Sequence, residues 1–149
     1  MKDKRGFTLI ELIVVLGLSG IVISIVMSFF IANYKSYETI STESEVQYQS
    51  QYIINYMTNI ILEAQMYEGS GTFRFINGEK SEFEVENKKI KHTSYNSNGT
   101  VKSVVSIGNY VKDIDITNNT NEVNITLILD KGNGNNYSAE QAIYMRNSN

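Results

Sequence analysis

The chain has 149 residues, which suits one ordinary domain with an appendage and is too short for two domains with separate cores. It contains no Cys and a single His, which excludes disulfides, thiolate nucleophiles and Cys- or His-rich metal sites. Thirteen basic and sixteen acidic residues give a net charge of -3, which does not suggest a protein built to coat nucleic acid. The apolar residues are concentrated at the N-terminal end of the chain.

The first 32 residues consist of a short basic segment and a long apolar run. Residues 1–6 read MKDKRG, and residues 7–32 contain Glu11 as their only charge. As a helix, the run would be about 39 Å long, more than the roughly 30 Å hydrocarbon core of a bilayer. The basic flank predicts a single-pass anchor with its N-terminus in the cytoplasm. The run is too long for a secretory signal peptide, and no A-x-A-like cleavage site follows it.

Glu11 lies inside this apolar run. A carboxylate in a membrane helix is costly, so it needs a partner, and such residues default to a functional hypothesis. A free amine generated nearby would be a natural partner.

Residues 4–16, KRGFTLIELIVVL, closely resemble the class III signal of type IV prepilins and type II secretion pseudopilins. In that family a membrane-embedded prepilin peptidase cuts after the Gly and methylates the new N-terminal amine. The resemblance implies cleavage between Gly6 and Phe7 and N-methylation of Phe7. It also implies that Glu11 pairs with the terminal amine of a neighbouring subunit and so sets the register of assembly. Loss of the leader would change the net charge from -3 to about -5.

A second helical segment follows at residues 33–67, which contain no helix breaker. Its apolar positions recur at helical spacing and predict a face to bury. These positions are Val46, Ile53, Ile54, Met57, Ile60, Ile61 and Ala64. Together with the anchor, the pattern predicts one helix from Phe7 to about Tyr67, less kinked than that of a major pilin because the chain has no Pro.

Beyond Gly69 the apolar period becomes two, which predicts an antiparallel β domain over residues 68–149 with six to eight strands. The expected strand pairs are 72–76 with 79–86, 90–95 with 101–107, and 110–117 with 122–129. We expect a loop at 130–136 and a last short strand near 142–145. The predicted fold class is α+β, and the resemblance implies a pilin fold in which the long helix packs on one antiparallel sheet.

The order of these elements looks like that of J-type pseudopilins and W-type minor pilins. Many major pilins have a Pro that interrupts the helix and a C-terminal disulfide loop, and this chain has neither Pro nor Cys. The resemblance therefore favours a minor pilin or pseudopilin.

Two weaker candidate sites lie in the β domain. Lys88, Lys89 and Lys91, with His92 expected at the surface, would form a small basic patch for DNA or an anionic surface, or simply protect a strand edge. The loop at 130–136 offers oxygen ligands such as those of Asp130 for calcium, or is an ordinary Asn-Gly loop.

The sequence contains no nucleophile and base arrangement and no phosphate-binding Gly pattern, so it predicts neither an enzyme nor a cofactor. The leading hypothesis is a structural subunit of a type IV pilus, a competence filament or a type II secretion filament. Its partners would be other pilins, prepilin peptidase, a membrane assembly platform and the lipid bilayer before assembly. The protein would lie in the cytoplasmic membrane and then at the cell surface. The alternative is a pilin-like module that binds DNA or a surface in competence or adhesion.

Overall fold

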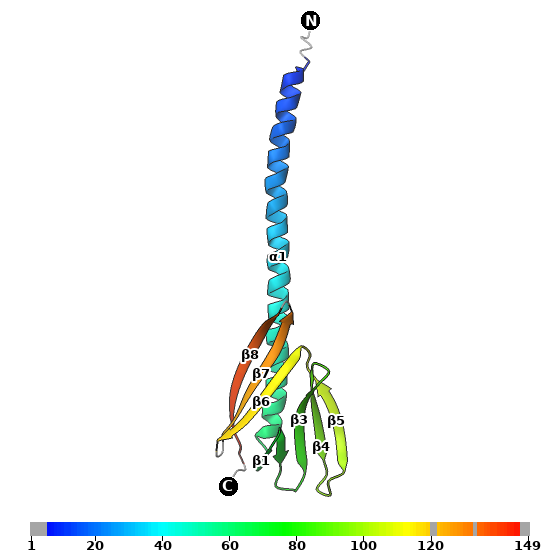
Figure 1. Cartoon of the computed structure of the whole chain (residues 1–149), viewed down its shortest axis with the longest axis vertical. Coiled ribbons are helices and arrows are strands. Elements are labelled where there is room, and N and C mark those ends of the chain that lie inside the picture. The colour runs from blue at the N-terminus through cyan, green and yellow to red at the C-terminus, as the bar shows by residue number, and fades with distance from the viewer. Residues whose placement is uncertain (1–5, 120–121, 133, 147–149) are drawn as a thin grey trace. The chain divides into compact units, whose positions relative to one another are not determined.

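A computed structural model describes residues 6–119, 122–132 and 134–146. The chain begins with one long helix, α1 (Leu9–Ile61), and continues into eight strands arranged in two antiparallel sheets (Figure 1). This is a pilin-like α+β architecture, as the sequence predicts. The chain divides within α1 into two compact units, Met1–Ser41 and Thr42–Asn149, which are described separately.

The first unit is the apolar part of α1. Its most apolar 18-residue window has a mean hydropathy of 2.7, and none of that window is buried within the chain. The hydroxyls of Ser24 and Ser28 donate to main-chain carbonyls one turn earlier, those of Gly20 and Ser24, at 2.9 Å each. These polar groups are therefore satisfied inside the helix, as an apolar environment requires.

The second unit contains the last five turns of α1 and packs one face of them against the strands. The buried residues on this face are Val46, Ser50, Ile53, Met57 and Ile61. Of the positions predicted to be buried, Val46, Ile53, Met57, Ile61 and Ala64 are confirmed. Ile54 and Ile60, also predicted, are half-buried at the edge of the core.

The helix ends at Ile61, six residues before the expected end near Tyr67. Amides after Ile61 bond carbonyls three residues back, from Glu63 to Ile60 at 3.2 Å and from Ala64 to Ile61 at 3.0 Å, which tightens the chain into a turn. The next amide, of Gln65, then bonds the carbonyl of Arg74 at 2.8 Å. The expected last turn of helix is therefore replaced by the start of a strand.

The first sheet has five strands in sequence order. They are β1 (Met66–Gly69), β2 (Thr72–Arg74), β3 (Lys80–Glu86), β4 (Lys89–Tyr95) and β5 (Val101–Ile107). The predicted pairings of β2 with β3 and of β4 with β5 are confirmed.

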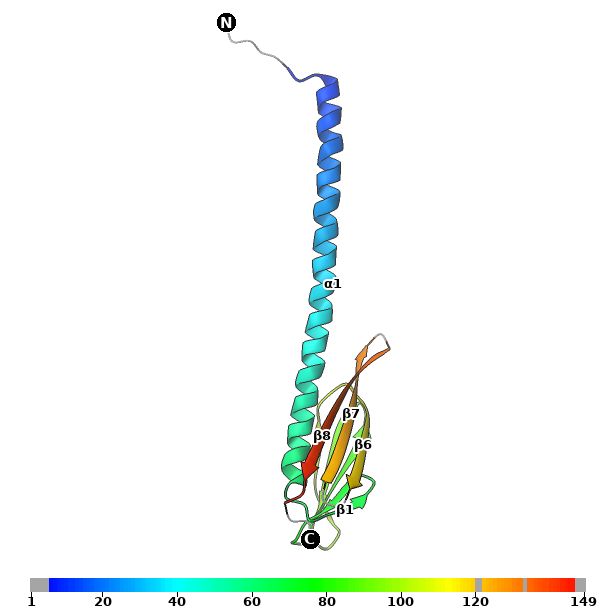
Figure 2. The same ribbon diagram turned by 90° about the vertical axis from the view of Figure 1, so that its left-hand side faces the viewer.

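The second sheet has three strands, β6 (Val111–Asn119), β7 (Glu122–Gly132) and β8 (Asn135–Tyr144). Figure 2 shows them beside the last turns of α1. The expectation of one sheet is corrected to two. The expected loop at 130–136 is also corrected, because β7 and β8 pair as far as Asp130 with Asn136 and Gly132 with Asn135. The last strand is accordingly ten residues long.

The core lies between α1 and the two sheets. Alternate residues of β7 are fully buried as predicted, namely Val123, Ile125, Leu127 and Leu129. In the first sheet the rings of Phe73 and Phe83 pack edge to face, with an angle of 69° between the ring planes and 6.0 Å between the centroids. Every described buried apolar side chain belongs to Thr42–Asn149, so this segment has a complete core of its own.

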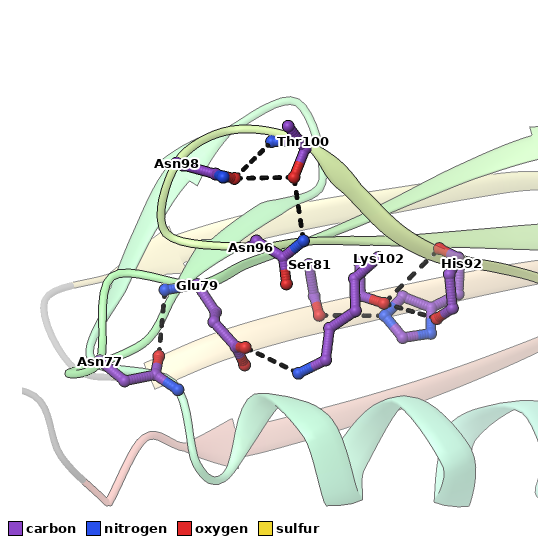
Figure 3. A network of polar contacts seen from close by, with 10 residues as sticks. Asn77, Glu79, Ser81, His92, Asn96, Asn98, Thr100 and Lys102 are labelled. Atoms are coloured by element: carbon purple, nitrogen blue, oxygen red, sulfur yellow. Dashed lines mark hydrogen bonds and ion pairs between the residues drawn. The ribbon is translucent and has the colours of Figure 1, made fainter.

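His92 belongs to this core, and its expected surface position is wrong. The side chain is 7% exposed because β4 alternates, which places His92 on the same face as buried Ile90. Its ring stacks on Phe83 with centroids 4.8 Å apart. Its Nδ1 lies 2.8 Å from the hydroxyl of Tyr56, and its Nε2 lies 3.0 Å from that of Ser81 (Figure 3 shows the contact with Ser81).

This imidazole therefore links α1, through Tyr56, to β3, through Ser81. Burial lowers the pKa of His92 below its ordinary value of 6.5, because the charged ring would lose its hydration. Burial also raises the pKa of the Tyr56 phenol, with a smaller contribution from Tyr52. Both groups are thus held in their neutral forms.

The single His makes the stability of the second unit depend on pH near neutrality. Between the lowered folded-state pKa and 6.5, the unfolded chain binds a proton that the folded chain does not. The free energy of unfolding of Thr42–Asn149 should be greatest above pH 6.5 and fall as the pH decreases, by at most about 1.4 kcal/mol per pH unit.

Chemical denaturation of that segment between pH 7.5 and 5.5 measures this slope. His92→Gln has a side chain that hydrogen bonds without titrating, so its slope should be nearly flat whatever its absolute stability. Equal slopes for the wild type and His92→Gln would contradict the assignment.

Candidate assembly site at the start of the helix

The N-terminal end of α1 is organised around Thr8 and Glu11. The Thr8 amide and hydroxyl both donate to Glu11 Oε2, at 2.8 Å each. The Glu11 amide approaches the Thr8 hydroxyl oxygen at 3.4 Å, and the Leu12 amide donates to the Thr8 carbonyl at 3.2 Å. This reciprocal arrangement is a capping box, in which the first free amides of a helix are satisfied by side chains.

The capping box gives Glu11 a partner within its own chain. The carboxylate lies at the positive end of the helix dipole, which favours a negative charge in the first turn. Thr8 donates both of its hydrogen bonds to Glu11 Oε2. Glu11 Oε1 accepts no hydrogen bond from the described residues. One carboxylate oxygen thus organises the helix start while the other remains open to a further donor.

The two residues at the expected cleavage position precede this box. Gly6 and Phe7 lie before the first residue of the helix, in chain without regular structure. The Phe7 side chain is 91% exposed, and a Cβ built on Gly6 would meet no atom within 4 Å. The bond between them is therefore accessible, as a protease substrate must be.

The helix after the capping box presents a continuous exposed surface. All residues from Gly6 to Glu45 are exposed, and most of the side chains in the first half of α1 are large and apolar. Exposed apolar area of this extent marks contact with lipid or with another protein.

The candidate basic patch does not form a free cationic surface. Lys91 Nζ lies 2.7 Å from Glu84 and 3.4 Å from Glu86, and these carboxylates raise its pKa. Lys88 lies 3.3 Å from Asp130. Lys89 is exposed opposite Glu86 in the register of β3 and β4. The structure thus pairs or faces each of these cations with a carboxylate.

The candidate calcium ligands are also engaged by the chain. Asp130 accepts the Gly132 amide at 2.9 Å and the Lys88 ammonium, and these bonds lower its pKa. The Asn136 side-chain oxygen accepts a bond from Lys112 at 3.3 Å. Across the described residues, which leave out Asn133, no group of three or more acidic or His side chains is arranged to hold a metal ion.

The comparisons with known proteins agree with the chemistry at this end of the chain. Residues 1–27 match the family model of the prokaryotic N-terminal methylation motif. No curated protein matches the chain. No solved structure matches it either. The chain therefore carries a type IV prepilin-like class III signal, and this motif supports a precursor of the type IV pilin or pseudopilin kind.

Proposed function

We propose that this protein is a minor pilin or pseudopilin, a structural subunit of a type IV pilus or a related filament. The observation that carries the proposal is the methylation motif at residues 1–27, most of which lies in the exposed apolar part of α1. Such a helix satisfies its internal backbone hydrogen bonds by itself, so its apolar surface can be buried in a bilayer or among the helices of neighbouring subunits. The role needs no catalytic residue in this chain.

Prepilin peptidase would cut between Gly6 and Phe7 and methylate the new amine of Phe7. This cut would leave the capping box intact, because the box is formed by Thr8 and Glu11. The mature chain would keep its helix start and gain an amine only four residues before Glu11.

Glu11 would then act in assembly. Its Oε1, which accepts no hydrogen bond from any described residue, can accept the Phe7 amine of a neighbouring subunit while Oε2 stays bound to Thr8. Opposite charges that meet in an apolar filament core neutralise each other, whereas an unpaired charge there would be strongly destabilising. The requirement for a partner makes one axial position of the neighbour much more stable than others.

The proposal of a minor pilin or pseudopilin, as opposed to a major pilin, rests on the order of the elements. A long helix, hairpins and a closing pair of strands resemble the J-type pseudopilins and W-type minor pilins, and the chain lacks the Pro and Cys of many major pilins. The subunit would be inserted in the cytoplasmic membrane with its N-terminus in the cytoplasm, and Thr42–Asn149 would end on the outside. DNA or surface binding is not favoured, because Lys88 and Lys91 are ion-paired.

Processing is the first expected outcome. When the full chain is produced together with a prepilin peptidase, intact mass should show loss of residues 1–6 and gain of one methyl group. Gly6→Leu should prevent the cut, since a bulky side chain replaces the residue before the cleaved bond. Gly17→Leu, a change at a second exposed glycine of α1, should be processed normally. An unchanged mass for the wild-type chain would refute the proposal.

A second pair of variants separates the two roles of Glu11. Glu11→Gln retains hydrogen-bonding groups for the capping box but removes the charge. We expect processed Glu11→Gln to be lost from filaments sheared from cells that assemble them. Thr8→Ala removes the capping partner, at a cost of about 1 kcal/mol to the helix start, and keeps the charge, so incorporation should persist.

Immunoblots of sheared filaments and of membranes, normalised to processed chain, measure both effects. If Thr8→Ala abolished incorporation as fully as Glu11→Gln, the helix cap rather than the charge would be the requirement, and the register role of Glu11 would be wrong.

A further inference from the structure

The apolar part of α1 ends in a short aromatic segment. Residues 12–32 contain no charged side chain, and the next charged residue is Lys35. Tyr34 and Tyr37 stand on either side of this lysine, and their side chains are 70% and 73% exposed. Residues three or four positions apart share a face of a helix, so both tyrosines lie on one side of α1, in line with Phe30.

The hydroxyls of the two tyrosines differ from the other polar groups of this segment. The side chains of Asn33 and Ser36 donate to main-chain carbonyls one turn earlier, at 2.8 Å and 3.0 Å. The hydroxyls of Tyr34 and Tyr37 form no hydrogen bond within the described part of the chain. Each of these side chains therefore combines an apolar ring with a hydroxyl that needs water or a lipid headgroup as its partner.

The position of the tyrosines matches the thickness of a bilayer. As a helix, residues 12–32 are about 31 Å long, and the hydrocarbon core of a bilayer is roughly 30 Å thick. When this segment fills the hydrocarbon, Tyr34 and Tyr37 lie at a membrane–water interface, where tyrosine is enriched in membrane proteins. Lys35 lies at the same level, and its long side chain can extend to the headgroups.

The opposite end of the apolar run has no such side chains. The first tyrosine of the sequence is Tyr34, and the chain contains no Trp. The aromatic residue at that end, Phe7, has no polar group. The basic residues that would mark that end belong to residues 1–6, which the expected cleavage would remove. In the mature chain the tyrosine end would therefore have to determine the depth of the helix.

We propose that Tyr34 and Tyr37 bind the membrane–water interface and fix the depth at which α1 crosses the bilayer before assembly. An apolar run that is longer than the hydrocarbon core can occupy several depths, and interfacial aromatic and basic side chains select one of them. The inference rests on the proposed function for the insertion of α1 in a membrane. It adds the lipid interface as the partner of these two side chains.

This depth determines where the other end of the helix lies. With residues 12–32 in the hydrocarbon, Glu11 lies at the opposite interface rather than at the apolar centre, so its carboxylate can stay hydrated until assembly. The bond between Gly6 and Phe7 lies a few residues further out, where water can reach it. Tyrosines at one end of the span thereby keep the expected cleavage position in water at the other end.

Single cysteines can report the depth of the helix, because the native chain has none. The full chain, produced in cells that assemble no filament, would carry Ser36→Cys between the tyrosines or Ser28→Cys inside the span. In spheroplasts, a membrane-impermeant maleimide should label Ser36→Cys and leave Ser28→Cys unlabelled. Tyr34→Leu with Tyr37→Leu extends the apolar surface by about one turn, so position 36 should move into the bilayer and its labelling should fall several-fold.

Three further double variants serve as controls. Tyr48→Leu with Tyr52→Leu makes the same change at two exposed tyrosines further along α1 and should leave the labelling of Ser36→Cys unchanged. Tyr34→Trp with Tyr37→Trp keeps an apolar ring with a polar N–H and should also leave it unchanged. Tyr34→Phe with Tyr37→Phe keeps the rings alone and should reduce it.

Absence of labelling of Ser36→Cys in the otherwise native chain, or equal labelling in the native and Leu backgrounds, would overturn the proposal. Equal labelling of Ser28→Cys and Ser36→Cys would overturn it as well. Reduced labelling with Trp but not with Phe would indicate that the rings contact a neighbouring helix instead of the interface, and would also overturn it.

Intact mass separates this proposal from the proposed function when the same cells contain a prepilin peptidase. A chain that keeps residues 1–6 but shows the expected labelling sinks only the proposed function. A processed chain with equal labelling in all backgrounds sinks only the interfacial role of Tyr34 and Tyr37.

Discussion

The structure depends on one constraint: the apolar first half of α1 is exposed along its whole length in the described part of the chain. Every side chain from Gly6 to Glu45 is exposed, and most of those in the first turns are large and apolar. Burial of such surface is worth about 25 cal/mol per Å², so the segment is stable only where lipid or other protein covers it. A single helix can satisfy all its internal backbone hydrogen bonds in either environment, which a strand cannot. Transfer from a membrane to a filament, as proposed, would therefore need no refolding of this segment.

The second unit solves a different problem, which is to hold a short stretch of helix on two small sheets without disulfides. The described core side chains all lie within Thr42–Asn149, and a few polar groups join its elements. His92 connects the helix and the first sheet, and Tyr67 connects β1 to the second sheet through the Ile116 carbonyl. Because buried polar groups are costly when unpaired, these contacts specify how the elements fit rather than how tightly they are held.

Much of this fold could be predicted from local pattern. The apolar stripe of Val46, Ile53 and Met57 and the alternation of β7 follow directly from the two side-chain periods. The end of the helix could not be predicted, because the strand β1 owes its existence to pairing with β2, as between Met66 and Arg74. The division into two sheets was missed for the same reason: alternation identifies strands but not their neighbours.

The burial of His92 and the capping role of Thr8 could have been predicted from sequence spacing. His92 follows Ile90 by two positions in β4, so a period of two already places it on the buried face. Thr8 stands three residues before Glu11, the spacing of a capping box at the start of an apolar helix. By contrast, the neutralisation of Lys91 and Lys88 depends on strand register and on tertiary contact, so it is visible only in the structure.

The apolar helix leaves one problem that it cannot solve by itself. Hydrophobic burial is nearly non-directional, so helices packed through such a surface can slide past one another with little change in free energy. Successive equivalent positions of two helices differ by about 5.4 Å, one turn. A slip of one turn would move the Glu11 carboxylate about 5.4 Å from the amine of a neighbouring subunit and leave the charge unpaired in an apolar surrounding, which is strongly destabilising. A single charged position in the first turn of α1 would thereby fix the axial offset that the apolar surface leaves open.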